Sequence, residues 1–211
     1  MTPSKPTAKQ RDADVTKERL LDAALASFSV RGFEASSTRQ IETMAGVKRG
    51  LIGYHFGSKQ ALWKAAADHI MTVAEQELSR ALISIEHVDP DARLRFFIRS
   101  YVAFCARHPE VNRLMIQEGM DTEWRLEWLL DRVVRRWYTQ VCQLFEEAGA
   151  RGTAPDMPAH HFYYIVTGAA TLMFSNALEA QALSHKNPLS PEVVEAHAEA
   201  LANLFVPGNT P

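Results

Sequence analysis

Helical periodicity is the feature that most constrains the fold of this chain. Apolar residues recur every three or four positions along almost all of its 211 residues. In one early stretch Leu21, Ala24, Leu25 and Phe28 share a helix face. No run shows the strict alternation of a half-buried strand. The pattern therefore predicts an all-α protein.

Polar caps, prolines and glycines divide this pattern into nine predicted helices. Ser36–Ser37, Ser58, Asp89–Pro90, Pro109 and Ser190–Pro191 are typical of helix starts. Gly32, Gly46 and Gly149 are typical of helix ends. The predicted helices cover about 16–31, 38–45, 47–55, 58–85, 90–106, 109–118, 122–148, 157–183 and 191–205.

Composition and charge restrict the class of protein. The chain is 46% apolar and 23% charged, as in soluble globular proteins, and no apolar window reaches transmembrane length. Its net charge of −2 is unevenly distributed: residues 1–64 hold 11 basic and 6 acidic side chains, and residues 65–211 hold 12 and 19. A basic end on an acidic body favours contact with nucleic acid through the amino-terminal part.

The segment Thr38–Phe56 has the spacing of a helix-turn-helix. Two short helices flank a turn at Ala45–Gly46–Val47, where glycine permits a sharp reversal. Four apolar residues are expected to lock the helices together: Ile41, Ala45, Val47 and Ile52. The outer face of the second helix keeps cations at its start and an aromatic hydroxyl near its end, which suits the major groove of DNA.

These residues resemble a known family. Gly32–Ile41, with sequence GFEASSTRQI, and Ala45–Lys59, with sequence AGVKRGLIGYHFGSK, are similar to the amino-terminal domain of TetR/AcrR-family transcriptional regulators. The resemblance covers about residues 16–64 and implies a two-domain helical architecture. Residues 14–57 would form the DNA-binding domain and 58–206 a ligand-binding and dimerisation domain, between a disordered basic tail at 1–13 and a short tail at 207–211.

The resemblance also implies a function and a set of DNA contacts. The expected protein is a homodimeric repressor that binds a palindromic operator and is released by a small-molecule inducer. The positions carried over from the family motif are Thr38, Arg39, Lys48, Arg49, Gly50, Leu51, Tyr54, His55 and Lys59. Lys48 or Arg49 is expected to read a guanine edge and Leu51 to pack on a thymine methyl. Thr38, Tyr54 and Lys59 are expected to contact the DNA backbone.

Three residues depart from the family pattern. Glu42 replaces a small residue, and either alters the packing of the two helices or points outward. Lys48 replaces a capping Ser or Thr, so a DNA phosphate is expected to occupy the helix start. Gly53 costs about 1 kcal/mol of helix propensity relative to alanine, which predicts a loose recognition helix.

The larger carboxy-terminal part is expected to bind the effector and the second copy. Candidate pocket residues are Tyr101, Met115, Trp128, His161, Tyr164 and Met173, although aromatic and methionine side chains are more often core. This set favours an apolar or aromatic effector. Small residues such as Gly168 in helix 157–183, together with helix 191–205, predict a four-helix dimer seam. The long helix 58–85 is expected to couple the two domains by its tilt.

Other chemistries have little support in the sequence. His160–His161 lacks accompanying metal ligands, and no nucleophile, phosphate or dinucleotide motif occurs, so neither catalysis nor a cofactor is expected. Cys105 and Cys142 are expected to be buried thiols, as in a cytoplasmic protein without a membrane partner. The remaining alternative is a helical co-regulator module without a ligand response.

Overall fold

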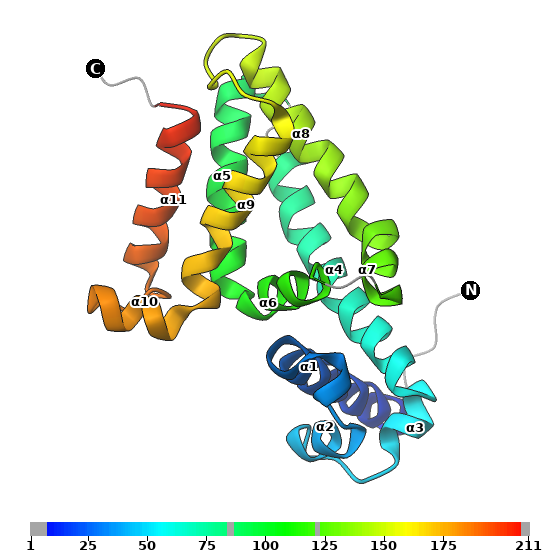
Figure 1. Cartoon of the computed structure of the whole chain (residues 1–211). Helices are drawn as coiled ribbons and strands as arrows, with labels where there is room; N and C mark the ends of the chain where they lie inside the picture. The colour runs from blue at the N-terminus through cyan, green and yellow to red at the C-terminus, as the bar shows by residue number, and fades with distance from the viewer. Residues whose placement is uncertain (1–7, 84–86, 121–122, 208–211) are drawn as a thin grey trace. The chain divides into compact units, whose positions relative to one another are not determined.

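The structure of the chain is a computed structural model that describes residues 8–83, 87–120 and 123–207, with side chains for 12–78, 87–120 and 123–207. These ranges contain helices and no strand (Figure 1), so the all-α prediction is confirmed. The helices are α1 (Ala8–Ala35), α2 (Thr38–Met44), α3 (Leu51–Phe56), α4 (Lys59–Ile83), α5 (Pro90–Arg107), α6 (Pro109–Glu118), α7 (Trp124–Leu129), the π-helical turn η1 (Leu130–Val134), α8 (Arg135–Gly149), α9 (Ala159–Ser175), α10 (Ala177–Ser184) and α11 (Pro191–Phe205).

Local capping signals placed most of these boundaries correctly. Asp89 accepts a hydrogen bond from the Asp91 amide at 3.3 Å and opens α5, and Ser58 Oγ accepts one from the Ala61 amide at 3.0 Å at the start of α4. The first helix begins earlier than predicted. Residues 8–13, expected in a disordered tail, belong to α1, while residues 1–7 lie outside the described residues.

The predicted helix 157–183 is two helices. Asn176 leaves the helical region of backbone space, with φ −108° and ψ 41°, and separates α9 from α10. The apolar pattern continues across this break, which is why periodicity joined the two. With α7, η1 and α8 taken as one continuous helix, the described chain therefore has ten helices where nine were predicted.

The chain divides into two compact units, Met1–Thr72 and Val73–Pro211. The first unit holds α1, α2, α3 and the start of α4. Its buried apolar side chains come from all four helices and include Leu20, Phe28, Ile41, Ile52 and Leu62. Two buried hydroxyls, Ser27 Oγ and Ser36 Oγ, lie 2.9 Å apart and tie α1 to the segment before α2.

In the second unit α5 is the central helix and packs against α6, α8, α9 and α11. The core contains a stacked pair, Phe145 and Phe162, with ring centroids 4.3 Å apart. Between α5 and α11, two arginines pair with two glutamates: Arg95 with Glu199, and Arg99 with both Glu195 and Glu199.

Cys105 and Cys142 are both free and buried, as the sequence predicted. Burial raises the pKa of the Cys105 thiol to about 12, so this thiol stays protonated near neutral pH. Among the described helices, none is both long enough and apolar enough to cross a membrane.

Candidate nucleic-acid interface

The supporting helix α2 starts at a complete capping box. Ser37 Oγ accepts a hydrogen bond from the Gln40 amide at 3.2 Å, and Gln40 Oε1 accepts one from the Ser37 amide at 3.4 Å. This reciprocal pair satisfies amide groups that have no partner within the helix. The start of α2 is therefore fixed by residues that are adjacent in sequence.

The turn after α2 is longer than predicted, because α3 begins only at Leu51. Gly46 has φ +64°, and a β-carbon there would lie 2.7 Å from a guanidinium nitrogen of Arg19. Gly50, the N-cap of α3, has φ +88° and is also left-handed. Both glycines have a left-handed backbone, which does not continue a helix. The recognition helix therefore begins at Leu51, four residues after the predicted start at Val47.

Lys48, Arg49 and Gly50 therefore lie in the turn, and the prediction that they form the front of the recognition helix is wrong. Lys48 and Arg49 are exposed. Lys48 is two residues outside the N-cap position, so its identity does not decide how α3 is capped. The two cations lie beside the start of the recognition helix on a segment with a left-handed glycine at its end.

Glu42 is buried, with 5% of its surface exposed, and points toward α3. Its Oε1 accepts a hydrogen bond from the Ile52 amide at 3.0 Å, and its carbonyl oxygen accepts one from the Val47 amide at 3.1 Å. The Glu42 side chain thus takes part in the contact between α2 and α3 and does not point outward. The sequence analysis did not predict this hydrogen bond; the absence of a side-chain acceptor at Gly50, just before α3, could have indicated that an acceptor comes from another helix.

The other predicted contact residues differ in exposure. Tyr54 is 80% exposed and its ring packs edge-on against His55, while Arg39 is exposed and Thr38, Leu51, His55 and Lys59 are half-buried. Gly53 has no atom within 4 Å of the position of a β-carbon, so this part of α3 is open. The structure thus brings most of the predicted set to the region of α2, α3 and the turn between them.

Lys59 makes contacts within its own unit. Its ammonium donates to the Glu34 carbonyl oxygen at 3.2 Å and lies 4.3 Å from the centre of the Phe33 ring. These contacts tie the start of α4 to the end of α1. If Lys59 also contacts the DNA backbone, it does so with an ammonium group that already contacts Glu34 and Phe33.

The predicted effector residues of the second unit differ in burial. Tyr101 is half-buried; its ring centroid lies 5.8 Å from that of Phe97, on which it stacks, and 5.9 Å from that of Trp137, and burial raises its pKa. Met115 and Trp128 are half-buried, whereas His161 and Tyr164 are exposed on α9.

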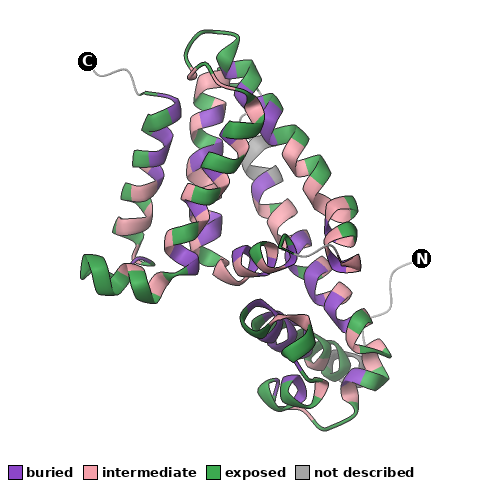
Figure 2. Cartoon of the chain, viewed as in Figure 1, coloured by how far each residue is buried: buried purple, intermediate pink, exposed green. Residues whose placement is uncertain are grey.

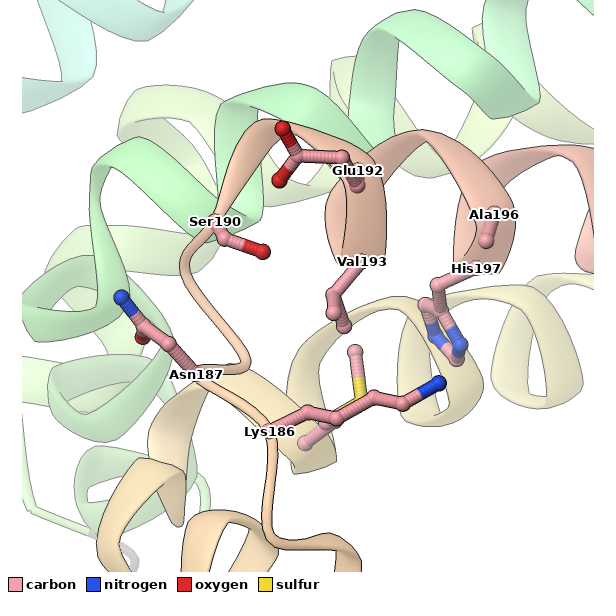
Figure 3. Close-up of a pocket in the computed structure, with 8 residues that line it drawn as sticks. Lys186, Asn187, Ser190, Glu192, Val193, Ala196 and His197 are labelled. Atoms are coloured by element: carbon pink, nitrogen blue, oxygen red, sulfur yellow. The ribbon is translucent and has the colours of Figure 1, made fainter.

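Met173 lines an open pocket of about 630 Å³ between α9, the segment after α10 and α11. Figure 3 shows the Lys186 side chain extending across this pocket toward His197. His197 Nε2 donates to the Ala169 carbonyl oxygen at 2.8 Å, which fixes the ring against α9. The remaining lining residues are Asn187, Ser190, Glu192, Val193 and Ala196. Among the described residues, no cluster of three or more His, Cys, Asp or Glu side chains is arranged to hold a metal ion.

Comparison with known proteins agrees with this geometry. Residues 20–66 match the family model of bacterial regulatory proteins of the tetR family. The chain is 30% identical over 120 residues to the transcriptional repressor NicS of Pseudomonas putida, across 57% of this chain and 56% of NicS. It is 31% identical over 110 residues to the transcriptional regulator RutR of Escherichia coli, across 52% of this chain and 50% of RutR. The aligned part of the chain thus covers about half the length of each of these curated relatives.

The fold extends the likeness to both units. AibR, crystallised in complex with isovaleryl coenzyme A and operator DNA, superposes with a TM-score of 0.73, covering 91% of this chain and 98% of AibR at 16% sequence identity. Residues 20–66, which match the family model, contain the whole helix-turn-helix: α2 with its capping box, the turn with exposed Lys48 and Arg49, and α3. Residues 20–66 therefore match the tetR family of bacterial regulatory proteins, and the chain has the fold of TetR-like regulators.

Proposed function

We propose that this chain is a ligand-responsive transcriptional repressor that binds a palindromic operator as a homodimer and releases it when a small molecule binds. The observation that carries the proposal is the helix-turn-helix within residues 20–66, which matches the family model and leaves its cations exposed. Lys48 and Arg49 flank the start of α3, and Tyr54 projects from it. This combination suits a helix in the major groove with phosphates on either side.

The DNA contacts divide into two kinds. On α3 the half-buried Leu51 and the exposed Tyr54 face base edges, and Leu51 packs on a thymine methyl. Lys48 and Arg49 reach phosphates or a guanine edge from the turn, because an extended cationic side chain is not confined to the helix face. Arg39 and Thr38, at the start of α2, add backbone contacts that hold the register.

Dimerisation is supported by exposed apolar residues on α9 and α11. On α9, Ile165, Gly168 and Leu172 lie three and four residues apart and are exposed, and Ala196, Ala200 and Leu204 form a similar stripe on α11. Figure 2 shows exposed positions along both helices. Two such helices from each copy would form a four-helix seam around a twofold axis. A dimer also presents two recognition helices to half-sites about one helical turn apart.

The effector is proposed to bind in the second unit. Phe97 and Tyr101 of α5 form an aromatic cluster with Trp137 of α8, which favours an apolar or aromatic ligand. AibR offers a precedent for a protein of this fold that takes both an acyl coenzyme A and operator DNA. For this chain the chemistry of the ligand is inferred from the cluster alone.

Selection of operator sequences from randomised DNA tests the proposal. The full chain should enrich a palindrome whose half-sites are about one helical turn apart. Its affinity for that site should fall steeply between about 50 and 200 mM salt as phosphate counterions are released. The double variant Lys48→Ala/Arg49→Ala should bind weakly with a shallower salt slope. Weak binding that is independent of both sequence and salt would overturn the proposal and favour a co-regulator module.

A further inference from the structure

The recognition helix α3 has no cap of its own. Its N-cap residue is Gly50, which offers no side-chain acceptor, and the two residues before it are cations. A six-residue helix is also too short to be stable in isolation. Something outside α3 must therefore satisfy its first amide groups and fix its direction.

Glu42 of α2 provides this connection. It holds the connecting segment at both ends, since its carbonyl oxygen accepts from the Val47 amide and its Oε1 accepts from the Ile52 amide at 3.0 Å. A carboxylate beside the first amides of a helix also interacts favourably with the helix dipole. Burying a carboxylate costs free energy unless hydrogen-bond donors surround it. The buried Glu42 side chain therefore favours the arrangement in which the Ile52 amide of α3 lies within hydrogen-bond distance.

We propose that Glu42 is a positioning residue for operator recognition, whose carboxylate caps α3 and sets the direction in which Tyr54 and His55 face the DNA. This inference rests on the proposed DNA-binding function. It has a second consequence: because the Ile52 amide already donates to Glu42, a DNA phosphate does not take this amide. The phosphate contacts of this segment come from the side chains of Lys48 and Arg49.

Two neutral variants of similar size separate capping from space filling. Glu42→Gln keeps an oxygen acceptor at the same reach, and Glu42→Met fills the volume without an acceptor. Both are compared in the full chain with Glu34→Gln, which removes one exposed negative charge from the same unit without touching α3. The readouts are affinity for the selected operator and hydrogen exchange of the Ile52 amide.

Capping predicts that Glu42→Gln and Glu34→Gln stay within about threefold of the wild-type affinity. Glu42→Met should lose about 5- to 30-fold, the upper part of the range for removal of a helix cap, and its Ile52 amide should exchange faster. Equal affinities and equal Ile52 exchange for the Gln and Met variants would overturn the proposal. So would slow Ile52 exchange in Glu42→Met together with a loss of affinity.

If Glu42→Met does not fold, Glu42→Asp gives the same test. Asp keeps the charge but is one methylene shorter, so it should bind the operator less well than the neutral Gln variant. An Asp variant that binds better than Gln would overturn the capping role. The Ile52 exchange experiment needs no DNA, so a failure of operator binding by the wild-type chain is distinguishable from a failure of this inference.

Discussion

Arg125 Nε lies 2.6 Å from Glu118 Oε2, and both side chains are more than nine-tenths buried. The pair joins the end of α6 to the start of α7, and Glu123 also binds the Arg125 guanidinium. Removing Glu118 takes a buried carboxylate from the buried Arg125 guanidinium, which keeps its contact with Glu123. We therefore expect Glu118→Ala to lower the free energy of unfolding by about 1–3 kcal/mol in chemical denaturation, because the contact with Glu123 still compensates part of the Arg125 charge.

The double variant Glu118→Leu/Arg125→Leu is the control for this pair. It removes both charges together, and apolar replacement of a buried ion pair is often neutral. It should recover most of the stability lost in Glu118→Ala. A double variant as unstable as the single one would mean that the pair contributes through packing rather than through charge.

Gly46 is expected to be required for its backbone conformation. Alanine at φ +64° costs about 1–2 kcal/mol of folding free energy. The close approach of Arg19 adds less, because the far end of a flexible, exposed side chain can move away. Thermal or chemical denaturation of Gly46→Ala should show this loss. The double variant Gly46→Ala/Arg19→Ala should be no more stable than Gly46→Ala; full recovery would assign the cost to the steric contact instead.

The proposed dimer seam predicts the effect of charges on α9 and α11. Leu172 and Leu204 are 60% and 67% exposed in the single chain. Leu172→Glu and Leu204→Glu should give monomers in sedimentation velocity experiments, because two copies of the new charge would face each other near the twofold axis. Val30→Glu, at an equally exposed position on α1, should remain dimeric. If Leu172→Glu and Leu204→Glu both dimerise as the wild-type chain does, the interface lies elsewhere.

Glu77 predicts a pH dependence of stability. The hydrogen bond from Arg107 at 2.6 Å, with a contribution from His108, holds the pKa of Glu77 below its ordinary value of 4.5 despite burial. A lowered pKa in the folded chain stabilises the fold above the unfolded value, and this stability is lost as the pH falls through the folded value. The difference in unfolding free energy between wild type and Glu77→Gln should be constant near neutral pH and shrink below about 4.5.

Its size should stay below about 1 kcal/mol, since the pair is partly exposed to solvent. Arg107→Met is the control, because it removes the main cause of the shift. In that background the Glu77→Gln substitution should have less effect at neutral pH. A difference between wild type and Glu77→Gln that is unchanged down to about pH 3 would contradict this assignment.

The sequence predicted those parts of the fold that depend on neighbouring residues. Ser37 with Gln40, and Asp89 with Pro90, form caps within a few positions, so the starts of α2 and α5 were correct. The break at Asn176 was missed because neither proline nor glycine marks it. The start of α3 was also missed, since a hydrogen bond from a residue ten positions away and a left-handed Gly50 decide it. The inward direction of Glu42 is a tertiary property for the same reason.

The π-helical turn η1 has a consequence for the register of the helix in which it lies. A π-turn adds one residue to a turn of helix, so the residues of α8 are rotated by about 100° relative to an uninterrupted helix continued from α7. The buried side of α8, with Val141, Leu144, Phe145 and Ala148, faces the core in this phase. Deleting a single residue within 130–134 would restore a regular α-helix and turn that apolar side away from α5 and α9. The extra residue in η1 thus rotates α8 relative to α7, so that the apolar side of α8 faces the core although the helix is continuous.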